Sequence, residues 1–216
     1  MADVTAHPGD TRENGDTGDT ILTFGRLGIG SLGRRSAGWL GMMTLILTEA
    51  FLFGYLLFSY FFMAFHDGRD WLPAELPTFY LSGPNTILLL LSSVVVWLGE
   101  RSVRRERRIA GAAFLAGGLV MGAAFVAVQW IEWSEKPFRL DSNSYGSLFF
   151  VITGFHMAHV VAGLLILAAL SGWTAMGLFD RSRHAHVSIG VIYWHFVDAV
   201  WLAGFFTLYI TPYFMA

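Results

Sequence analysis

Five long apolar runs set the strongest limit on what this chain can fold into. They cover residues 37–66, 81–98, 109–130, 147–178 and 189–213. A helix needs about 20 mostly apolar residues to cross the hydrocarbon core of a bilayer, and each run approaches or exceeds that length. The first and fourth runs are long enough to tilt or to extend beyond the bilayer. The pattern predicts an all-α membrane protein built as a bundle of five transmembrane helices.

The composition agrees with a membrane protein. Hydrophobic residues make up 55% of the chain and charged residues 14%, whereas soluble domains average about 25% charged residues. The sequence contains no cysteine, which excludes disulfides, thiolate metal sites and c-type haem attachment. The one basic cluster is short and lies between two apolar runs, so we expect no nucleic-acid partner.

The domain organisation follows from the same runs. The first 20 residues carry five acidic residues against one arginine and have no apolar core, so they are not a signal peptide. We expect residues 1–35 to form a polar, disordered cytoplasmic tail. Residues 36–216 are expected to form one membrane domain, because no link between runs is long enough for a second domain and no internal repeat is visible.

The distribution of arginine and lysine predicts the orientation, since these residues concentrate in cytoplasmic loops. The N-terminal segment and the second and fourth links together carry 11 of them, whereas the first and third links carry 3. The N-terminus is therefore expected in the cytoplasm and the C-terminus outside. Small residues recur at a spacing of four at Gly118 and Gly122, and at Gly154, Ala158 and Ala162, a pattern that favours close packing of helices.

Several ionisable side chains fall inside the predicted spans. They are Glu49, His156, His159, His195 and Asp198. Because a charge at mid-membrane costs about 3 kcal/mol on insertion scales, each needs a partner or a function. The fourth and fifth spans run in opposite directions, which places His159 at a depth similar to that of His195 and Asp198, and we expect them close together. Gln129 and Glu132 fall at the outer mouth of the third span.

The residues alone leave three roles open for the histidines. They could bind a haem or a metal, relay protons with Glu49 and Asp198, or hold helices together through hydrogen bonds. A metal centre needs three or four converging ligands, and no motif here demands one. Glu49 has no basic partner in its own helix. It is either a buried, hydrogen-bonded acid or a group that exchanges protons.

Five short motifs resemble, in order, those of the cytochrome c oxidase subunit III family. The last span carries YWHFVD at 193–198, followed by Trp201 and Tyr209. The span before it carries YGS at 145–147 and TGFH at 153–156, followed by His159 and Gly163. PNT at 84–86, Gln129 with Glu132, and Glu49 complete the order. The resemblance runs from about residue 38 to residue 213.

This resemblance implies a non-catalytic accessory subunit of a haem-copper terminal oxidase, in a multi-pass arrangement in a bacterial plasma membrane. In that family subunit III has no haem or copper of its own, since these lie in partner subunits. It packs mainly against subunit I, with subunit II and small subunits nearby, and it binds phospholipid. It also supports proton uptake and protects the enzyme during turnover. Glu49 matches the family's buried helix carboxylate, and His156, His159, His195 and Asp198 match its intramembrane polar network.

The chain departs from the seven-helix form of the family, because the acidic tail stands where two further helices would precede residue 37. This leaves open whether the lipid site is complete within the chain and whether the electron donor is cytochrome c or quinol. Two alternatives remain at this point. One is the subunit III-like accessory protein of nitric oxide reductase, and the other is a free-standing membrane transporter or haem protein.

Overall fold

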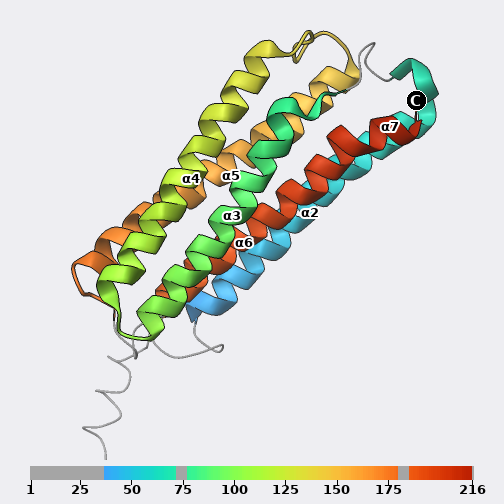
Figure 1. Cartoon of the computed structure of the whole chain (residues 1–216). Coiled ribbons are helices and arrows are strands. Elements are labelled where there is room, and N and C mark those ends of the chain that lie inside the picture. Colours follow the sequence, from blue (N-terminus) through green and yellow to red (C-terminus); the bar gives the residue numbers. More distant parts are fainter. Residues whose placement is uncertain (1–36, 72–76, 180–184, 216) are drawn as a thin grey trace, which may run out of the picture.

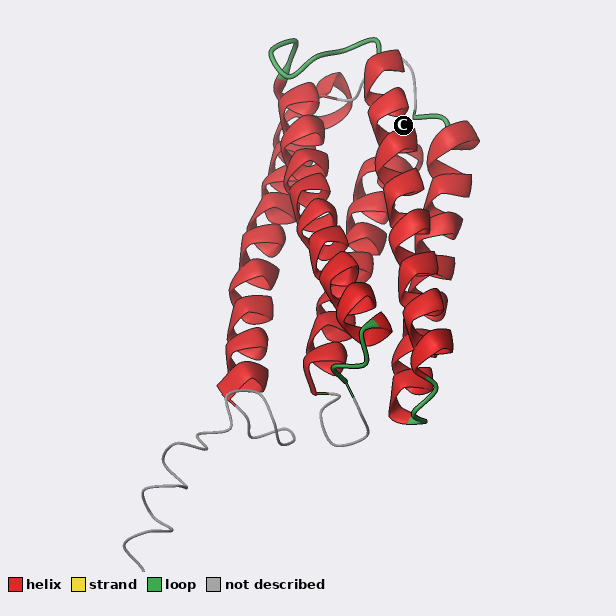
Figure 2. Cartoon of the chain, turned by 90° about the vertical axis from the view of Figure 1, so that its left-hand side faces the viewer, coloured by secondary structure: helices red, strands yellow, loops and turns green. Residues whose placement is uncertain are grey.

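The computed structural model describes residues 37–71, 77–179 and 185–215, and it places them in a bundle of long helices (Figure 1). The elements are α2 (Ala37–Asp67), the 3₁₀ turn η2 (Gly68–Trp71), α3 (Phe79–Arg104), α4 (Arg108–Glu135), α5 (Ser144–Ala175), α6 (Ala185–Phe205), the π-helical segment η3 (Phe206–Ile210) and α7 (Thr211–Met215). Seen from the side, the described part of the chain contains helices and loops and no strand (Figure 2). The tail expected at residues 1–35 lies outside the described residues.

Five helices are long and apolar enough to cross a membrane, which confirms the fold class; the last of them is the continuous stretch Ala185–Met215. Most helices extend beyond the predicted apolar runs. The third run was predicted at 109–130, whereas α4 continues to Glu135. Hydropathy detects the part of a helix that lies in hydrocarbon, while the backbone continues to form hydrogen bonds through the polar membrane interface.

Four helices form a closed arrangement and the fifth lies beside it. Helices α3, α4, α5 and α6 pack in a ring in which α6 also contacts α3, and α2 packs against α5 and α6. Only 6% of the most apolar window of α2 is buried, against 28–44% for the other four spans. Most of α2 therefore faces outward, including the large side chains of Phe51, Tyr55, Phe58, Phe62 and Phe65.

Trp194 of α6 lies at the centre of the four-helix ring. Its side chain is fully buried, and its Nε1 donates a hydrogen bond of 3.1 Å to the Oγ of Ser92 in α3. A Cβ atom on Gly122 of α4 would lie 2.6 Å from the Trp194 ring, and a Cβ on Gly163 of α5 would lie 2.7 Å from it. The absence of a side chain at both glycines is what leaves space for this indole.

The predicted small-residue contacts are right for α4 and wrong for α5. Gly118 and Gly122 are buried against Val96 and Trp194, respectively. In α5, Ala158 and Ala162 are exposed, and a Cβ on Gly154 would have no neighbour within 4 Å. The spacing of four was a correct sign of one helix face, but in α5 that face points away from the bundle.

Pro212 accounts for the irregular end of the last span. Proline has no N–H, so it cannot donate to the carbonyl of Leu208 four residues earlier. The Tyr145 hydroxyl of α5 donates to that carbonyl instead, at 3.4 Å. The backbone around this point widens into η3, and Thr211 Oγ1 donates to the carbonyl of Phe206 five residues earlier. This local π-helical turn positions Tyr209, which is fully buried.

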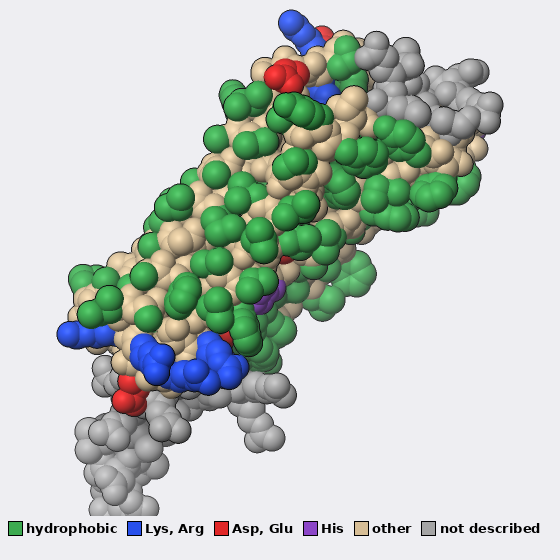
Figure 3. All heavy atoms as spheres, viewed as in Figure 1, with side chains coloured by type: hydrophobic (Ala, Val, Ile, Leu, Met, Phe, Trp, Pro, Cys, Tyr) green, Lys and Arg blue, Asp and Glu red, His purple; other side chains and the backbone are tan. Residues whose placement is uncertain are grey.

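The two ends of the bundle differ in charge (Figure 3). Arg101, Arg104, Arg105, Arg107 and Arg108 lie where α3 turns into α4, and we call this the arginine end. Lys136 lies at the opposite end, just after α4. The arginine residues at 12, 26, 34, 35, 181 and 183, which also entered the orientation count, lie outside the described residues.

Candidate functional site

Glu49 and His159 form a pair between α2 and α5. The Nε2 atom of His159 lies 3.0 Å from Oε2 of Glu49, and its Nδ1 lies 2.7 Å from the carbonyl oxygen of Phe155. Both side chains are largely covered, with 16% of His159 and 29% of Glu49 exposed. No sequence feature indicated which helix would supply the partner of Glu49.

The contacts of His159 define where protons lie in this pair. A carbonyl oxygen only accepts, so Nδ1 must carry a hydrogen. If the imidazole is neutral, Nε2 has a lone pair and Glu49 must be the protonated donor. If Nε2 also carries a hydrogen, the imidazole is a cation and Glu49 is a carboxylate. In both states one proton is held between the two side chains.

His195 and Asp198 form a second group with Ser93 of α3. Nδ1 of His195 lies 2.7 Å from Ser93 Oγ, and Ser93 donates a short hydrogen bond to Oδ2 of Asp198. Because the Ser93 proton points to Asp198, Nδ1 of His195 supplies the hydrogen for its own contact with Ser93. Ser93 was not among the residues predicted from the sequence. A serine in an apolar span gives little signal, since its hydroxyl can bond to its own helix.

His156 stands apart from both groups. Its side chain is buried, and neither ring nitrogen has a hydrogen-bond partner among the described residues. The imidazole packs against the ring of Trp201 at 4.8 Å and that of Phe125 at 5.9 Å, measured between centroids. Its contacts are therefore those of an aromatic core residue.

The four intramembrane residues expected in one network fall into separate groups, in which only His195 and Asp198 are joined, through Ser93. Among the described residues, no hydrogen bond connects His159 to His195, contrary to the expected contact. Depth along a helix does not specify the direction in which a side chain points around it. Tyr193 of α6 faces α5, where its hydroxyl donates to the carbonyl of His159 at 3.3 Å. His195 follows two residues later, a rotation of about 200°, and so it faces α3.

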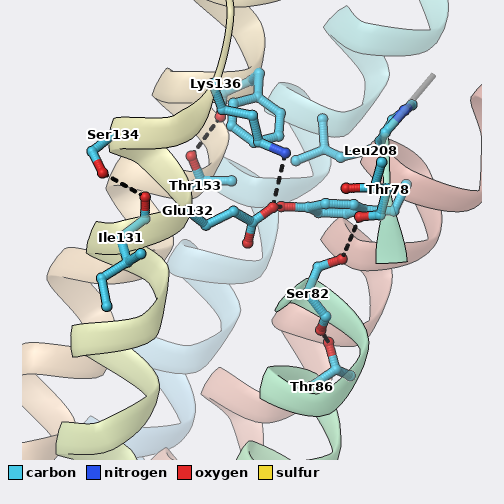
Figure 4. Close-up of polar contacts among 12 residues, drawn as sticks. Thr78, Ser82, Thr86, Ile131, Glu132, Ser134, Lys136, Thr153 and Leu208 are labelled. Atoms are coloured by element: carbon cyan, nitrogen blue, oxygen red, sulfur yellow. Dashed lines mark hydrogen bonds and ion pairs between the residues drawn. The ribbon is translucent and has the colours of Figure 1, made fainter. Parts of the chain in front are cut away.

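Gln129 and Glu132, expected at the mouth of the third span, are buried at the end opposite the arginine end, with 1% and 4% of each residue exposed. Glu132 Oε1 accepts a hydrogen bond of 2.6 Å from the Tyr209 hydroxyl and lies 2.9 Å from Nζ of Lys136 (Figure 4). The ammonium also lies about 5 Å from the ring centroids of Phe149 and Tyr209. This group therefore joins the end of α4 to α5 and to the last span.

Lys136 and Tyr209 were not predicted from the sequence as partners of Glu132. The spacing of four between Glu132 and Lys136 was an available signal, but Tyr209 is 77 residues away in sequence. A cavity of about 190 Å³ opens beside the group, lined in part by Thr78, Glu135 and Tyr145. Gln129 Nε2 and Oε1 and Glu132 Oε2 have no protein partner among the described residues, and polar atoms of this kind bind water in protein interiors.

None of these groups has the ligands of a metal centre. Within residues 37–71, 77–179 and 185–215, no three or more histidine, cysteine, aspartate or glutamate side chains converge. The group of Ser93, His195 and Asp198 also lacks the order of a hydrolytic triad, since the serine lies in the middle and donates to the acid, whereas a nucleophilic serine donates to the histidine. The geometry fits proton holding and helix packing.

Comparison with a family model and with known proteins gives the same protein family in each case. The family model described as Cytochrome c oxidase subunit III matches residues 34–214. Cytochrome c oxidase subunit 3 of Danio rerio is 33% identical over 180 residues, covering 78% of this chain and 67% of that protein. Cytochrome c oxidase subunit 3 of Thermostichus vulcanus is 30% identical over 174 residues, covering 79% of this chain and 86% of that protein. The subunit 3 of Prototheca wickerhamii is 31% identical over 180 residues.

Proposed function

The chain belongs to the cytochrome c oxidase subunit III family, and we propose that it is the non-catalytic accessory subunit of a haem-copper terminal oxidase. It is a multi-pass membrane subunit of the respiratory chain. In this proposal haem and copper are held by the partner subunits, and this chain packs against the oxygen-reducing subunit I, close to subunit II. We propose a bacterial plasma membrane, which the likeness to the Thermostichus protein supports. The arginine end is proposed to face the cytoplasm, which the arginine and lysine count supports.

The pair formed by Glu49 and His159 carries the mechanistic part of the proposal, which is support of proton uptake by the complex. The pair holds one proton in either of its two states, because Nδ1 of His159 is committed to a carbonyl oxygen and Nε2 faces Glu49. Moving that proton between Nε2 and Oε2 interconverts a neutral pair and an ion pair without breaking the contact. If the shared proton leaves the pair, the lone pair of Nε2 and the carboxylate of Glu49 face each other, so the pair favours taking up a proton again.

A role in phospholipid binding is the second part of the proposal. It is supported by the outward face of α2, where five large side chains are 57–80% exposed, namely Phe51, Tyr55, Phe58, Phe62 and Phe65. These side chains recur every three or four residues and form one continuous apolar strip. Acyl chains are the apolar partners that such a strip meets in a bilayer.

Purification of the complex in mild detergent tests the proposed function. A tag on this chain should recover the haem-containing and copper-containing subunits together with it, and the recovered complex should consume oxygen. The same chain produced alone should have no Soret band. A Soret band from the isolated chain, or recovery without any haem-containing subunit, would contradict the proposal.

A further inference from the structure

Tyr209 differs from the other tyrosines of the described residues in the group that its hydroxyl faces. This hydroxyl donates a hydrogen bond of 2.6 Å to Oε1 of Glu132. The hydroxyls of Tyr145, Tyr193 and Tyr213 donate instead to backbone carbonyl oxygens, at 3.4, 3.3 and 2.8 Å. A carboxylate can take over the proton itself, whereas a carbonyl oxygen only accepts the hydrogen bond. Tyr209 therefore has a base in place for its phenolic proton.

The surroundings of Glu132 keep this base ready and keep water away from it. Nζ of Lys136 lies 2.9 Å from Oε1 of Glu132 (Figure 4), and a neighbouring cation favours the ionised form of a carboxyl group. The length of 2.6 Å also matches hydrogen bonds from a hydroxyl to a carboxylate, which measure about 2.5–2.7 Å. Tyr209 is fully buried and 4% of Glu132 is exposed. A proton that leaves the phenol therefore passes to Glu132.

A run of aromatic rings leads from Tyr209 to the surface of the bundle. In order from Tyr209, the rings belong to Phe149, Phe150, Trp133 and Trp130, with successive centroids 6.1, 5.5, 5.9 and 5.9 Å apart. All four steps lie within the range of direct ring contact. Trp130 is 67% exposed. Indole and phenol are among the side-chain groups that lose an electron most readily, so the run has an oxidisable ring at each end.

We propose that Tyr209 is a redox-active tyrosine, which takes up an oxidising equivalent that reaches Trp130, with Glu132 as the base for its proton. The need for a base is chemical, because a phenol that has lost an electron is a strong acid. This role is separate from the proposed support of proton uptake. It assigns to the chain a site where an oxidising radical from the membrane is quenched.

The oxidant is an oxygen-centred radical in the bilayer, such as an alkyl peroxyl radical. It gains an electron from Trp130 and a proton from water, and so becomes a hydroperoxide. An electron from Tyr209 then refills the indole through the intervening rings. The phenolic proton moves to Glu132, which leaves a neutral tyrosyl radical beside a carboxylic acid. A thiolate restores the site when it gives up one electron and becomes a thiyl radical, while Glu132 returns the proton.

Electron paramagnetic resonance of the assembled complex in lipid nanodiscs tests the proposal. A lipid-soluble azo initiator, which generates alkyl peroxyl radicals in air, is the probe, and samples are frozen during the reaction. The wild-type complex should show the signal of a neutral tyrosyl radical, and Tyr209→Phe should lose the part that comes from this chain. The matched control is Tyr193→Phe, because Tyr193 is also buried but its hydroxyl faces a carbonyl oxygen.

Two further variants separate the redox role from a structural one. Glu132→Gln combined with Lys136→Met removes the base, while the amide oxygen can still accept the hydrogen bond of Tyr209. This variant should assemble and lose the same signal. Trp130→Phe changes an exposed ring and should lower the yield of the radical, even if Tyr209→Phe fails to assemble. A wild-type signal in either variant, or an equal loss in Tyr193→Phe, would overturn the proposal.

Discussion

Oε2 of Glu49 in α2 lies 3.0 Å from Nε2 of His159 in α5, and this contact is a polar link between α2 and the four-helix ring. Because Nδ1 of His159 is committed to the carbonyl of Phe155, a neutral His159 can only accept at Nε2. The contact therefore tolerates a neutral donor in place of Glu49, which separates its structural role from its titration.

The variant Glu49→Gln keeps a hydrogen-bond donor opposite His159 but removes the carboxyl group. The amide N–H can donate to Nε2 of His159, so we expect the complex to assemble with an unchanged haem spectrum. The amide cannot titrate, so activity or turnover lifetime should fall mainly at alkaline pH, where proton supply limits turnover. Oxygen consumption and turnover-dependent inactivation measured across pH are the readouts.

Two further variants serve as controls for Glu49. Glu49→Ala leaves the Nε2 atom of His159 without a partner, so it should also weaken assembly, by about 1–3 kcal/mol. His159→Gln combined with Glu49→Gln should cost no more activity than either change alone, because residues that act as a unit are not additive. A wild-type pH profile for Glu49→Gln would end the idea that this pair handles protons.

Gly122 and Gly163 should be sensitive to a single added methyl group, since each lies against Trp194. Gly122→Ala and Gly163→Ala are each expected to lower the free energy of unfolding by about 1–3 kcal/mol, as overpacking does in other cores. Gly154→Ala is the matched control, because nothing lies within 4 Å of its Cβ position. Unfolding of the chain by SDS in mixed micelles measures all three, and equal effects at Gly154 and Gly122 would contradict the packing argument.

Lys136 is expected to matter because its removal leaves Glu132 buried without a countercharge. Lys136→Met should destabilise the chain by about 3–5 kcal/mol, the usual effect of breaking a buried ion pair. Adding Glu132→Gln to Lys136→Met should recover much of the loss. Tyr209→Phe removes only the hydrogen bond of 2.6 Å and should cost about 1.5–3 kcal/mol. Thermal unfolding in detergent gives the comparison, and no recovery in the double variant would argue against the ion pair.

The orientation can be checked with single cysteines, since the chain has none of its own. Asp10→Cys should resist a membrane-impermeant maleimide added to intact cells, because the arginine and lysine count of 11 against 3 predicts that the N-terminus lies inside. Ser142→Cys, in the loop before α5, and Met215→Cys should be labelled. Labelling at residue 10 with protection at 142 and 215 would reverse the topology.

The number of spans and the family could be predicted from the sequence because both depend on local information. An apolar run such as that at 109–130 has few alternatives in a bilayer, where each backbone group must be satisfied within its own helix. The family motif at 193–198 is likewise read directly from neighbouring residues. The exact helix ends, such as the extension of α4 to Glu135, were less clear because the membrane interface accepts polar residues.

Which residues meet was decided by the tertiary structure alone. Depth along a helix follows from counting residues, but direction around the bundle depends on how the helices pack. For this reason the sequence could not predict that His159 contacts Glu49, 110 residues away, or that His195 contacts Ser93, 102 residues away. The sequence by itself determined that these side chains lie in the membrane and need partners. How the helices pack against one another, as where Trp194 lies against Gly122 and Gly163, decided which partners these side chains have.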